Sequence, residues 1–406
     1  MTELSTPWKT TQWWTSQYNF DPDVIGKKSF SDSIEMHDVT LRDGEQTPGV
    51  VFSKEDKAKI ARALDESKVH RIEAGMPVVS NEDKLAIKEI AKNSSFSKIF
   101  SFCRVRKEDI DASLDCGVDH IVMEIPALKQ RLQVMGMTVD DAASKAIEVI
   151  EYAKSRGLFV VFFPYDTTRS DYESISKMMK AGESAHADRL AVVDTVGASS
   201  PEGFAQLVSK VKHIVKVPLE VHCHNSLGFG TANAIAGLGA GAVCAHVAVN
   251  GIGEGAGNVA LEEVVVALKI AYGIDIGIDI GKLNVASQIV EKYSRIPIPV
   301  NKPVFGKNVF TREGGIAVER YFKLPEVARE MELFDPGWLG RRTEIVLGKK
   351  SGKYSILYAL REKGLSASDE QVKELLEEVK QKSIEKKGPV TPEEFDALVK
   401  RKLGST

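Results

Sequence analysis

Two histidines separated by one residue, His222 and His224, have the types and spacing that best suit metal binding in this sequence of 406 residues. Side chains two positions apart on a strand face the same side, so both imidazoles can reach one ion. Asp43, at the end of another strand-like segment, offers a third ligand. Two histidines and one carboxylate leave positions open for a chelating substrate and water. A hydrogen-bonded polar cluster without metal is the alternative interpretation.

The elements that must position these residues follow a regular alternation. Eight short segments rich in Val, Ile or Phe alternate with amphipathic segments of helical period. The strand-like segments are residues 35–41, 70–76, 98–104, 120–127, 159–166, 189–195, 219–225 and 242–251. Eight such units predict an α/β fold of the (β/α)8 TIM-barrel class. An open doubly wound sheet is disfavoured because the first strand is followed by LRDGEQ, which is not a Gly-rich phosphate loop.

Polar residues fall at the carboxyl ends of the predicted strands, where a TIM barrel builds its active site. Closure of the barrel would bring the first strand, and with it Asp43, near the seventh strand across the eighth. The other polar residues at this end include Arg42, Glu73, Arg104, Asp166, Thr195 and Asn250. The position of these residues and their chemistry therefore predict the same site.

The chain divides into three predicted parts. Residues 1–30 form an N-terminal arm, 31–285 the TIM-barrel catalytic domain, and 286–406 a Pro-punctuated linker followed by a small α-helical subdomain. Tryptophans in the arm are expected to pack on the outside of the fold or on a partner subunit.

Bulk composition excludes several classes of protein. The formal net charge is -3 and no basic block dominates, which argues against nucleic-acid and membrane-surface partners. No apolar run reaches the roughly 18 residues that span a bilayer, and the N-terminus does not read as a secretory signal. The four cysteines form no CxxC pair and are expected to be free buried thiols. A cytoplasmic location is expected.

Five motifs along the predicted barrel are HDVTLRDGEQTPGV, IEAGMP, DTVG, HCHNSLGFGTANAIAGLGAGA and NGIGEGAGNVALEEVV. In this order they resemble the aldolase-type metallolyase superfamily with a pyruvate carboxyltransferase domain. Its members include 2-isopropylmalate, homocitrate and citramalate synthases and 3-hydroxy-3-methylglutaryl-CoA lyase. VLGKKSGKYS and the helical tail are similar to the subdomain that follows the barrel in the synthases.

The resemblance implies a metal centre. Asp43, His222 and His224 would bind a divalent cation, with Asn258 as a further ligand. Mg²⁺, Mn²⁺ and Zn²⁺ all accept two histidines with oxygen ligands, so the metal stays open.

The resemblance also implies roles for three residues at the carboxyl ends of the strands, the rim of the barrel. Arg42 would steady the substrate ketone oxygen as it becomes an alkoxide, a sound use of a fixed guanidinium. Glu73 would orient Arg42 or the metal-bound water. Thr195 would hold the substrate carboxylate. A structural ion pair between Arg42 and Glu73 is compatible with these roles.

The sequence departs from its relatives where they carry a base. Ala317 stands where the synthases usually have a histidine that helps deprotonate acetyl-CoA, and Gly255 stands where they usually have arginine. The loop also lacks the catalytic cysteine of the lyases. Glu254 is then the predicted base, with a metal-bound hydroxide as an alternative. A purely structural role in the glycine loop fits Glu254 equally well.

The fifth strand departs as well. Homocitrate synthases carry an arginine there for a distal carboxylate, and this chain has Val161 followed by Phe162 and Phe163. Only one of the two Phe side chains can face inward. We expect Phe163 to line the substrate site and to favour a 2-oxo acid with an apolar side chain, although a plain core role is the alternative. Arg104 could supply a carboxylate clamp.

These features predict a metal-dependent Claisen-type condensation of an acyl-CoA, with acetyl-CoA as the expected cosubstrate, and a 2-oxo acid. The alternative is a retro-Claisen or retro-aldol lyase acting on a 3-hydroxyacyl substrate. A non-catalytic binding paralogue is a third hypothesis, which the intact set of rim residues disfavours. The resemblance to the synthases also implies a homodimer.

Overall fold

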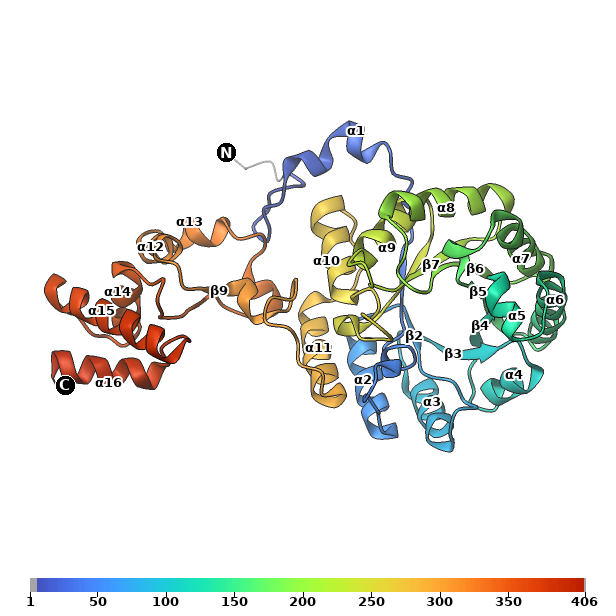
Figure 1. The fold of residues 1–406 in the computed structure, drawn as a ribbon, viewed down its shortest axis with the longest axis horizontal. Coiled ribbons are helices and arrows are strands. Elements are labelled where there is room, and N and C mark those ends of the chain that lie inside the picture. Colours follow the sequence, from blue (N-terminus) through green and yellow to red (C-terminus); the bar gives the residue numbers. More distant parts are fainter. Residues whose placement is uncertain (1–5, 405–406) are drawn as a thin grey trace. The chain divides into compact units, whose positions relative to one another are not determined.

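The computed structural model describes residues 6–404. Two compact units are present: residues 18–298 form one, and residues 6–17 together with 299–404 form the other. The first unit is the barrel, and the second contains the C-terminal helices (Figure 1).

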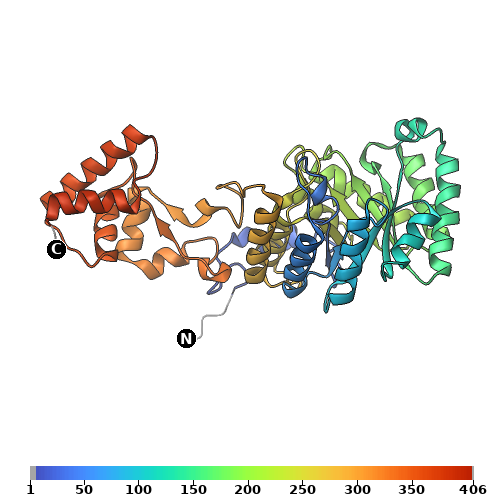
Figure 2. The same ribbon diagram turned by 90° about the horizontal axis from the view of Figure 1, so that it is seen from below.

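Eight parallel strands close into a barrel in sequence order, which confirms the predicted TIM-barrel fold. Figures 1 and 2 show the helices of this unit around the strands. The strands are β1 (Glu35–Asp38), β2 (Arg71–Glu73), β3 (Lys98–Arg104), β4 (His120–Pro126), β5 (Phe159–Tyr165), β6 (Arg189–Asp194), β7 (Leu219–Cys223) and β8 (Cys244–Val247).

Each strand is followed by at least one helix. The first helix of the ring shows why these segments are helical: Ser53 and Asp56 form a reciprocal capping box at its start, and Ile60 and Leu64, four residues apart, are buried. The helices of this unit are α1 (Pro22–Ile25), α2 (Lys54–Glu66), α3 (Asn81–Asn93), α4 (Lys107–Leu114), α5 (Lys129–Val134), α6 (Val139–Ser155), α7 (Tyr172–Ser184), α8 (Pro201–Ile214), α9 (Gly230–Gly239), α10 (Leu261–Tyr272) and α11 (Ile280–Ser294).

Alternate residues of the strands fill the barrel. Phe163 belongs to this interior cluster, whereas Phe162 lies close to Gly182 of α7 on the outer face of the strand. Strand alternation thus separates the two phenylalanines as predicted. The buried members of the interior cluster are Phe100, Phe102, Val122, Val161, Phe163, Ala191 and Val193.

The second unit has its own apolar core and confirms the predicted helical C-terminal region. Ile356, Leu375 and Phe395 are among its buried residues. The unit also contains a short parallel pair of strands, β9 (Thr311–Arg312) and β10 (Glu344–Ile345). Its helices are α12 (Gly315–Lys323), α13 (Pro325–Glu330), α14 (Lys353–Glu362), α15 (Asp369–Lys386) and α16 (Pro392–Leu403).

The first described residues of the arm pack on this C-terminal unit. The Trp13 and Trp338 ring centroids are 5.8 Å apart, and the Trp14 amide donates to the Leu333 carbonyl at 3.0 Å. The later part of the arm belongs to the barrel unit, where Phe30 makes an edge contact with Tyr272. The arm therefore has two different packing partners within the chain.

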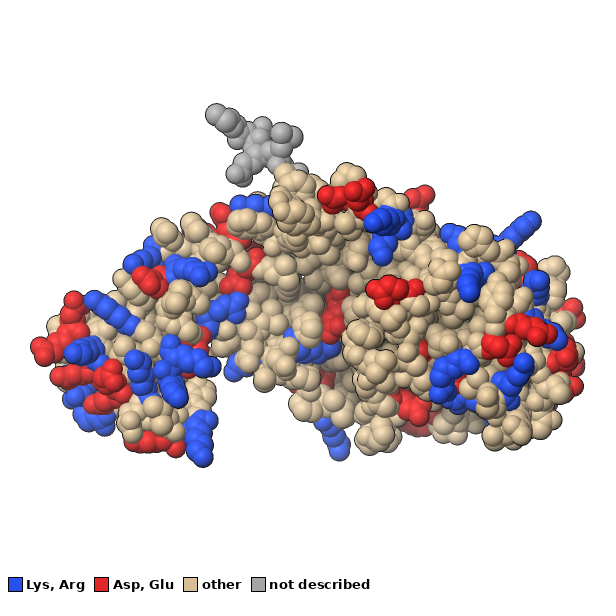
Figure 3. Space-filling view, turned by 45° about the horizontal axis from the view of Figure 1, so that its top comes forward, with Lys and Arg blue, Asp and Glu red and all other residues tan. Residues whose placement is uncertain are grey.

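Charges of both signs are mixed over the visible face of the molecule (Figure 3). Within residues 6–404, no helix has the length and apolar character needed to cross a bilayer.

Candidate metal centre

Three side chains meet at the carboxyl end of the barrel. The Nε2 atoms of His222 and His224 lie 3.6 and 3.7 Å from the Asp43 carboxylate, and one ligand atom from each of the three residues falls within 4.8 Å of the others. β7 supplies His222, and Asp43 lies in the turn after β1. The two histidines point to the same side, and all three residues are buried. This is the cluster that the spacing predicted.

The cluster has unsatisfied polar atoms, as a site built to hold an ion and a ligand should. Asp43 Oδ1, His222 Nδ1 and Arg42 Nη2 are buried without a hydrogen-bond partner in the described residues. A buried polar group without a partner costs about 1–3 kcal/mol. These atoms, together with the donor set of two imidazoles and a carboxylate, fit a divalent cation and an anionic ligand beside it.

Electrostatics favour the cation-binding states of Asp43 and His222 but not that of His224. Burial acts to raise the pKa of Asp43, but the Arg42 guanidinium and the two histidines together outweigh it, and the pKa lies below its usual range. Burial lowers the pKa of His222 well below its usual value, which favours the neutral imidazole. Burial also acts to lower the pKa of His224, but the Asp43 carboxylate outweighs it and the pKa is raised. Removal of a proton from His224 would therefore accompany ligation.

Arg42 is fixed from three sides. Its Nε donates to Glu73, its Nη1 lies 3.3 Å from Asp43, and its guanidinium lies over the Phe102 ring at 3.8 Å. Glu73 is fully buried, and its second oxygen is 3.3 Å from His37 Nε2. Burial lowers the pKa of His37 to about 4, so the neutral ring donates its Nε2–H to Glu73. The predicted ionic contact between Arg42 and Glu73 is present and links the cluster to the barrel interior.

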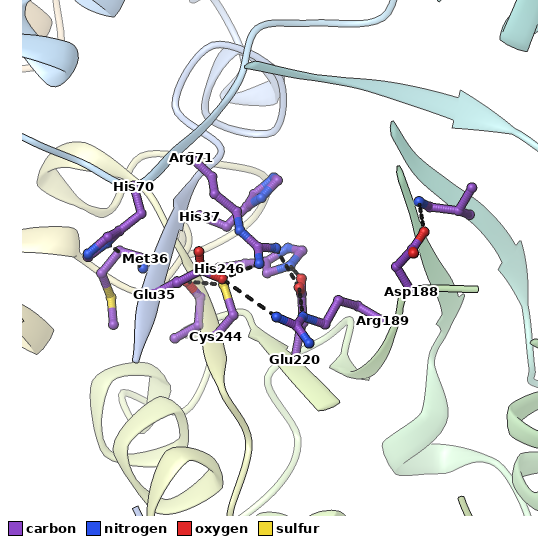
Figure 4. Close-up of polar contacts among 12 residues, drawn as sticks. Glu35, Met36, His37, His70, Arg71, Asp188, Arg189, Glu220, Cys244 and His246 are labelled. Atoms are coloured by element: carbon purple, nitrogen blue, oxygen red, sulfur yellow. Dashed lines mark hydrogen bonds and ion pairs between the residues drawn. The ribbon is translucent and has the colours of Figure 1, made fainter. Parts of the chain in front are cut away.

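The series of polar contacts from Arg42 through Glu73 to His37, called here the polar chain, continues through the barrel interior. His37 stacks on His246 at 4.4 Å, and His246 is 2.9 Å from Glu220. Glu220 accepts from Arg71 at 2.6 Å, and Arg71 also donates to Glu35 (Figure 4). The sequence reading gave His37 and His246 no role. The alternation of side chains along β1 and β8 could have indicated this contact, because residues in register on adjacent strands lie on the same face of the barrel wall.

The glycine-rich loop after β8 brings Asn258 beside His224. The two residues pair through their backbones, and the Asn258 amide nitrogen donates to the Ile252 carbonyl at 3.1 Å. This bond leaves the Asn258 carbonyl oxygen as the atom able to serve as a ligand. Gly257 has φ +89, and a Cβ there would lie 2.0 Å from the Gly251 oxygen, so the tight path requires glycine.

Glu254 lies in the same loop. Its main-chain carbonyl accepts a hydrogen bond from the His224 ring, which orients that imidazole. Its side chain is exposed. The position in the rim loop is as predicted, and the contact that the structure shows is made by the backbone.

The three predicted substrate contacts differ in their surroundings. Thr195 Oγ1 accepts from the Asp166 amide at 2.8 Å, and the Phe163 ring lies 5.1 Å from the His222 ring. Arg104 is half-exposed and forms a two-pronged ion pair with Asp109, with both bonds at 2.8 Å. Phe163 therefore borders the cluster of Asp43, His222 and His224, whereas the Arg104 guanidinium is occupied by a neighbouring carboxylate.

Sequence reasoning missed Glu124, an acidic side chain close enough to Arg42 to interact with it electrostatically. It lies on β4 in register with Arg104 on β3 and Phe163 on β5, so its side chain shares the inner face of the barrel. Burial raises the pKa of Glu124 to about 7, although the nearby Arg42 opposes the shift. A lone acidic residue on the inner face of the apolar segment HIVMEIPA was the available signal.

A closed eight-stranded barrel with two histidines and a carboxylate at its carboxyl rim defines the class as a TIM barrel with a candidate metal centre. A family model described as HMGL-like matches residues 33–290, and one described as homocitrate synthase post-HMGL domain-like matches residues 304–387. The chain belongs to the HMGL-like family.

Two curated relatives are similar over most of their length. The chain is 41% identical over 379 residues to homocitrate synthase AksA of Methanothermobacter thermautotrophicus, covering 92% of this chain and 95% of that one. It is 42% identical over 352 residues to (R)-citramalate synthase CimA of Methanocaldococcus jannaschii, covering 86% of this chain and 70% of that one. Both of these relatives are synthases by name.

Solved structures support the fold. The HMG-CoA lyase of Bacillus subtilis matches with a TM-score of 0.61 at 18% identity, covering 68% of this chain and 98% of that one. At this identity the likeness concerns the barrel architecture alone.

Proposed function

We propose that this protein is an acyltransferase that condenses acetyl-CoA with a 2-oxo acid, in the manner of homocitrate, citramalate and isopropylmalate synthases. The observation that carries the proposal is the Asp43–His222–His224 cluster with the Arg42 guanidinium fixed beside it. Similarity to synthases over more than nine-tenths of the chain supports the same reading. A role in amino-acid biosynthesis and a homodimer go with this assignment.

Asp43, His222 and His224 would hold Mg²⁺, Mn²⁺ or Zn²⁺, with Asn258 as a further ligand. When bound, the ion would supply Lewis acidity to the substrate ketone.

Arg42 supplies positive charge where the ketone oxygen becomes an alkoxide. Glu73 holds the guanidinium in place through its Nε, and His37 holds Glu73 in turn. Because Arg42 needs no rearrangement when charge develops, the interaction is stronger in the transition state than with the neutral ketone.

Three residues are proposed to recognise the 2-oxo acid. Thr195 would bond the carboxylate and Phe163 would contact the side chain. Arg104 would provide a second positive charge by exchanging Asp109 for a substrate carboxylate. The apolar ring of Phe163 favours a substrate side chain without charge.

Glu254 has two proposed roles. Its main-chain carbonyl orients His224, and its exposed carboxylate is a candidate for proton transfer from the acyl group. These roles separate in a Glu254→Gln variant, which keeps the backbone contact and loses the carboxylate.

The test is release of free thiol from acetyl-CoA by Mn²⁺- or Mg²⁺-loaded protein with pyruvate, 2-oxoisovalerate, oxaloacetate and 2-oxoglutarate. We expect release that depends on one of these acids, and none from His222→Ala, whose metal content should also fall. No release from the wild type with any acid, together with cleavage of 3-hydroxyacyl thioesters, would replace the synthase by the lyase alternative. Light scattering of the purified protein checks the dimer.

A further inference from the structure

Glu124 is an acidic side chain on the inner face of the barrel, in register with apolar Phe163 and two residues after apolar Val122. Val122, the preceding inward residue of β4, and Phe163, its neighbour on β5, belong to or border the apolar interior cluster. A carboxyl group in such a place costs stability unless it is paired or protonated. Its presence therefore needs a reason other than packing.

The Glu124 carboxyl group is also unpartnered. Among the residues that the structure describes, it has no hydrogen bond and no ion pair, and the groups that act on it do so through space. Arg104, in register with it, is turned to Asp109, and Arg42 is engaged by Glu73 and Asp43. The carboxyl group is thus left available for a substrate.

Charged and titratable groups surround Glu124 from every neighbouring element. The Arg42 guanidinium favours its ionised form, and the Glu73 and Asp43 carboxylates oppose ionisation. The full set comprises Arg42 and Asp43 after β1, Glu73 of β2, Arg104 of β3, Arg131 of α5 and Tyr165 of β5. Burial is the largest influence and raises the pKa to about 7, where a carboxylate is a competent base and its acid a competent donor at neutral pH.

We infer that Glu124 is a catalytic acid–base residue of the condensation: it removes the proton from the acyl methyl group and returns it to the new alkoxide. The inference rests on the proposed function. It is drawn from the position of Glu124 on the inner face of the barrel close to Arg42, the apolar side chains next to it on β4 and β5, and its lack of a hydrogen-bond or ion-pair partner among the described residues. Glu254, by comparison, is exposed and contacts His224 only through its backbone.

The proton steps balance without a further reagent. A Glu124 carboxylate oxygen takes a proton from the methyl carbon of the thioester, and the C–H electron pair forms an enolate. The enolate carbon attacks the ketone carbon of the 2-oxo acid, a C–C bond forms, and the C=O pair moves to the oxygen next to Arg42. Protonated Glu124 then gives its proton to this alkoxide and is regenerated. Water hydrolyses the thioester to a carboxylate and free thiol.

The experiment compares metal-loaded wild type with Glu124→Gln, Glu124→Asp and Glu254→Gln, using the 2-oxo acid that the wild type accepts. Glu148→Gln, an exposed glutamate on α6, is the matched control. Thiol release is measured from pH 5.5 to 9 with acetyl-CoA and with its trideuterated acetyl form. Metal-dependent thermal stability reports on folding.

We expect Glu124→Gln to lower kcat by at least 100-fold, to change both KM values by less than threefold, and to remove the acid limb of the kcat profile. The deuterium isotope effect on kcat should rise in Glu124→Gln. Glu124→Asp should restore part of kcat and the acid limb of its pH profile. A purely structural role would not move the limb or the isotope effect. Glu124→Gln within threefold of wild-type kcat, or loss of the limb in Glu254→Gln alone, would overturn the inference. No 2-oxo-acid-dependent release from the wild type would contradict the proposed function itself.

Discussion

Replacement of Glu73 by glutamine tests whether the charge on this residue holds Arg42 for catalysis. Glu73 is fully buried, accepts from Arg42 Nε and lies 3.3 Å from His37 Nε2. Glutamine keeps the shape and removes the charge. At an effective dielectric constant of 20, two unit charges about 3 Å apart attract by about 5 kcal/mol. Removing one partner of a buried ion pair costs about 3–5 kcal/mol. We expect Glu73→Gln to lower the free energy of unfolding by about 3 kcal/mol, because Asp43 still lies 3.3 Å from Arg42.

The same substitution should lower kcat by about 100-fold, or about 2.7 kcal/mol, because the donor to the alkoxide loses its fixed position. The KM for the 2-oxo acid should change little. Urea unfolding of the metal-loaded protein measures the loss of stability, and steady-state thiol release measures kcat and KM.

Glu220→Gln is the matched control. Glu220 is also fully buried, accepts from Arg71 at 2.6 Å and lies 2.9 Å from His246 Nε2, but it is at the other end of the polar chain. We expect a similar loss of stability with less than a tenfold change in kcat. If Glu220→Gln lowers kcat as much as Glu73→Gln, or if Glu73→Gln keeps wild-type kcat, the assignment of Glu73 to Arg42 positioning is refuted.

Three further changes have defined outcomes. The added Cβ of Gly253→Ala would lie 2.2 Å from Asn258 Nδ2 and displace that amide, so metal affinity in calorimetric titration should fall about tenfold. Gly255→Ala is the control, because its Cβ would have no atom within 4 Å, and its metal affinity should equal that of the wild type. Arg104→Ala should raise the KM for the 2-oxo acid about tenfold with under 1 kcal/mol lost in unfolding, and an unchanged KM would remove Arg104 from the substrate site. In metal-free protein, the pKa of Glu124 is raised from 4.5 to about 7, so its ionisation lowers the free energy of unfolding as the pH rises through this window. The free energy of unfolding of Glu124→Gln should equal that of the wild type at pH 4 and exceed it by about 1–3 kcal/mol at pH 8. Equal values at pH 8 would contradict the pKa shift.

The features that follow from chain periodicity could be predicted from the sequence. The eight strand–helix units fix the barrel, and alternation places His222 and His224 on one face and separates Phe162 from Phe163. Closure of the barrel brings Asp43 to the histidines, as expected from strand order.

Features that depend on which side chains meet across strands could not be read in the same way. The engagement of Arg104 by Asp109, five residues later, depends on the turn into α4. The stacking of His37 on His246 needs the register between β1 and β8. The pKa of Glu124 depends on burial and on Arg42, Asp43 and Glu73, which lie far from it in the chain.

The most direct test of the central claim follows the carbon atoms. Metal-loaded protein is incubated with acetyl-CoA labelled with ¹³C at the methyl carbon and with the accepted 2-oxo acid, and the label is followed by NMR. The account predicts that the label becomes a methylene carbon joined to a hydroxyl-bearing carbon, and that chelation of the metal or His222→Ala prevents this. Recovery of the label only as acetyl-CoA or free acetate, with metal bound, would contradict a condensing enzyme.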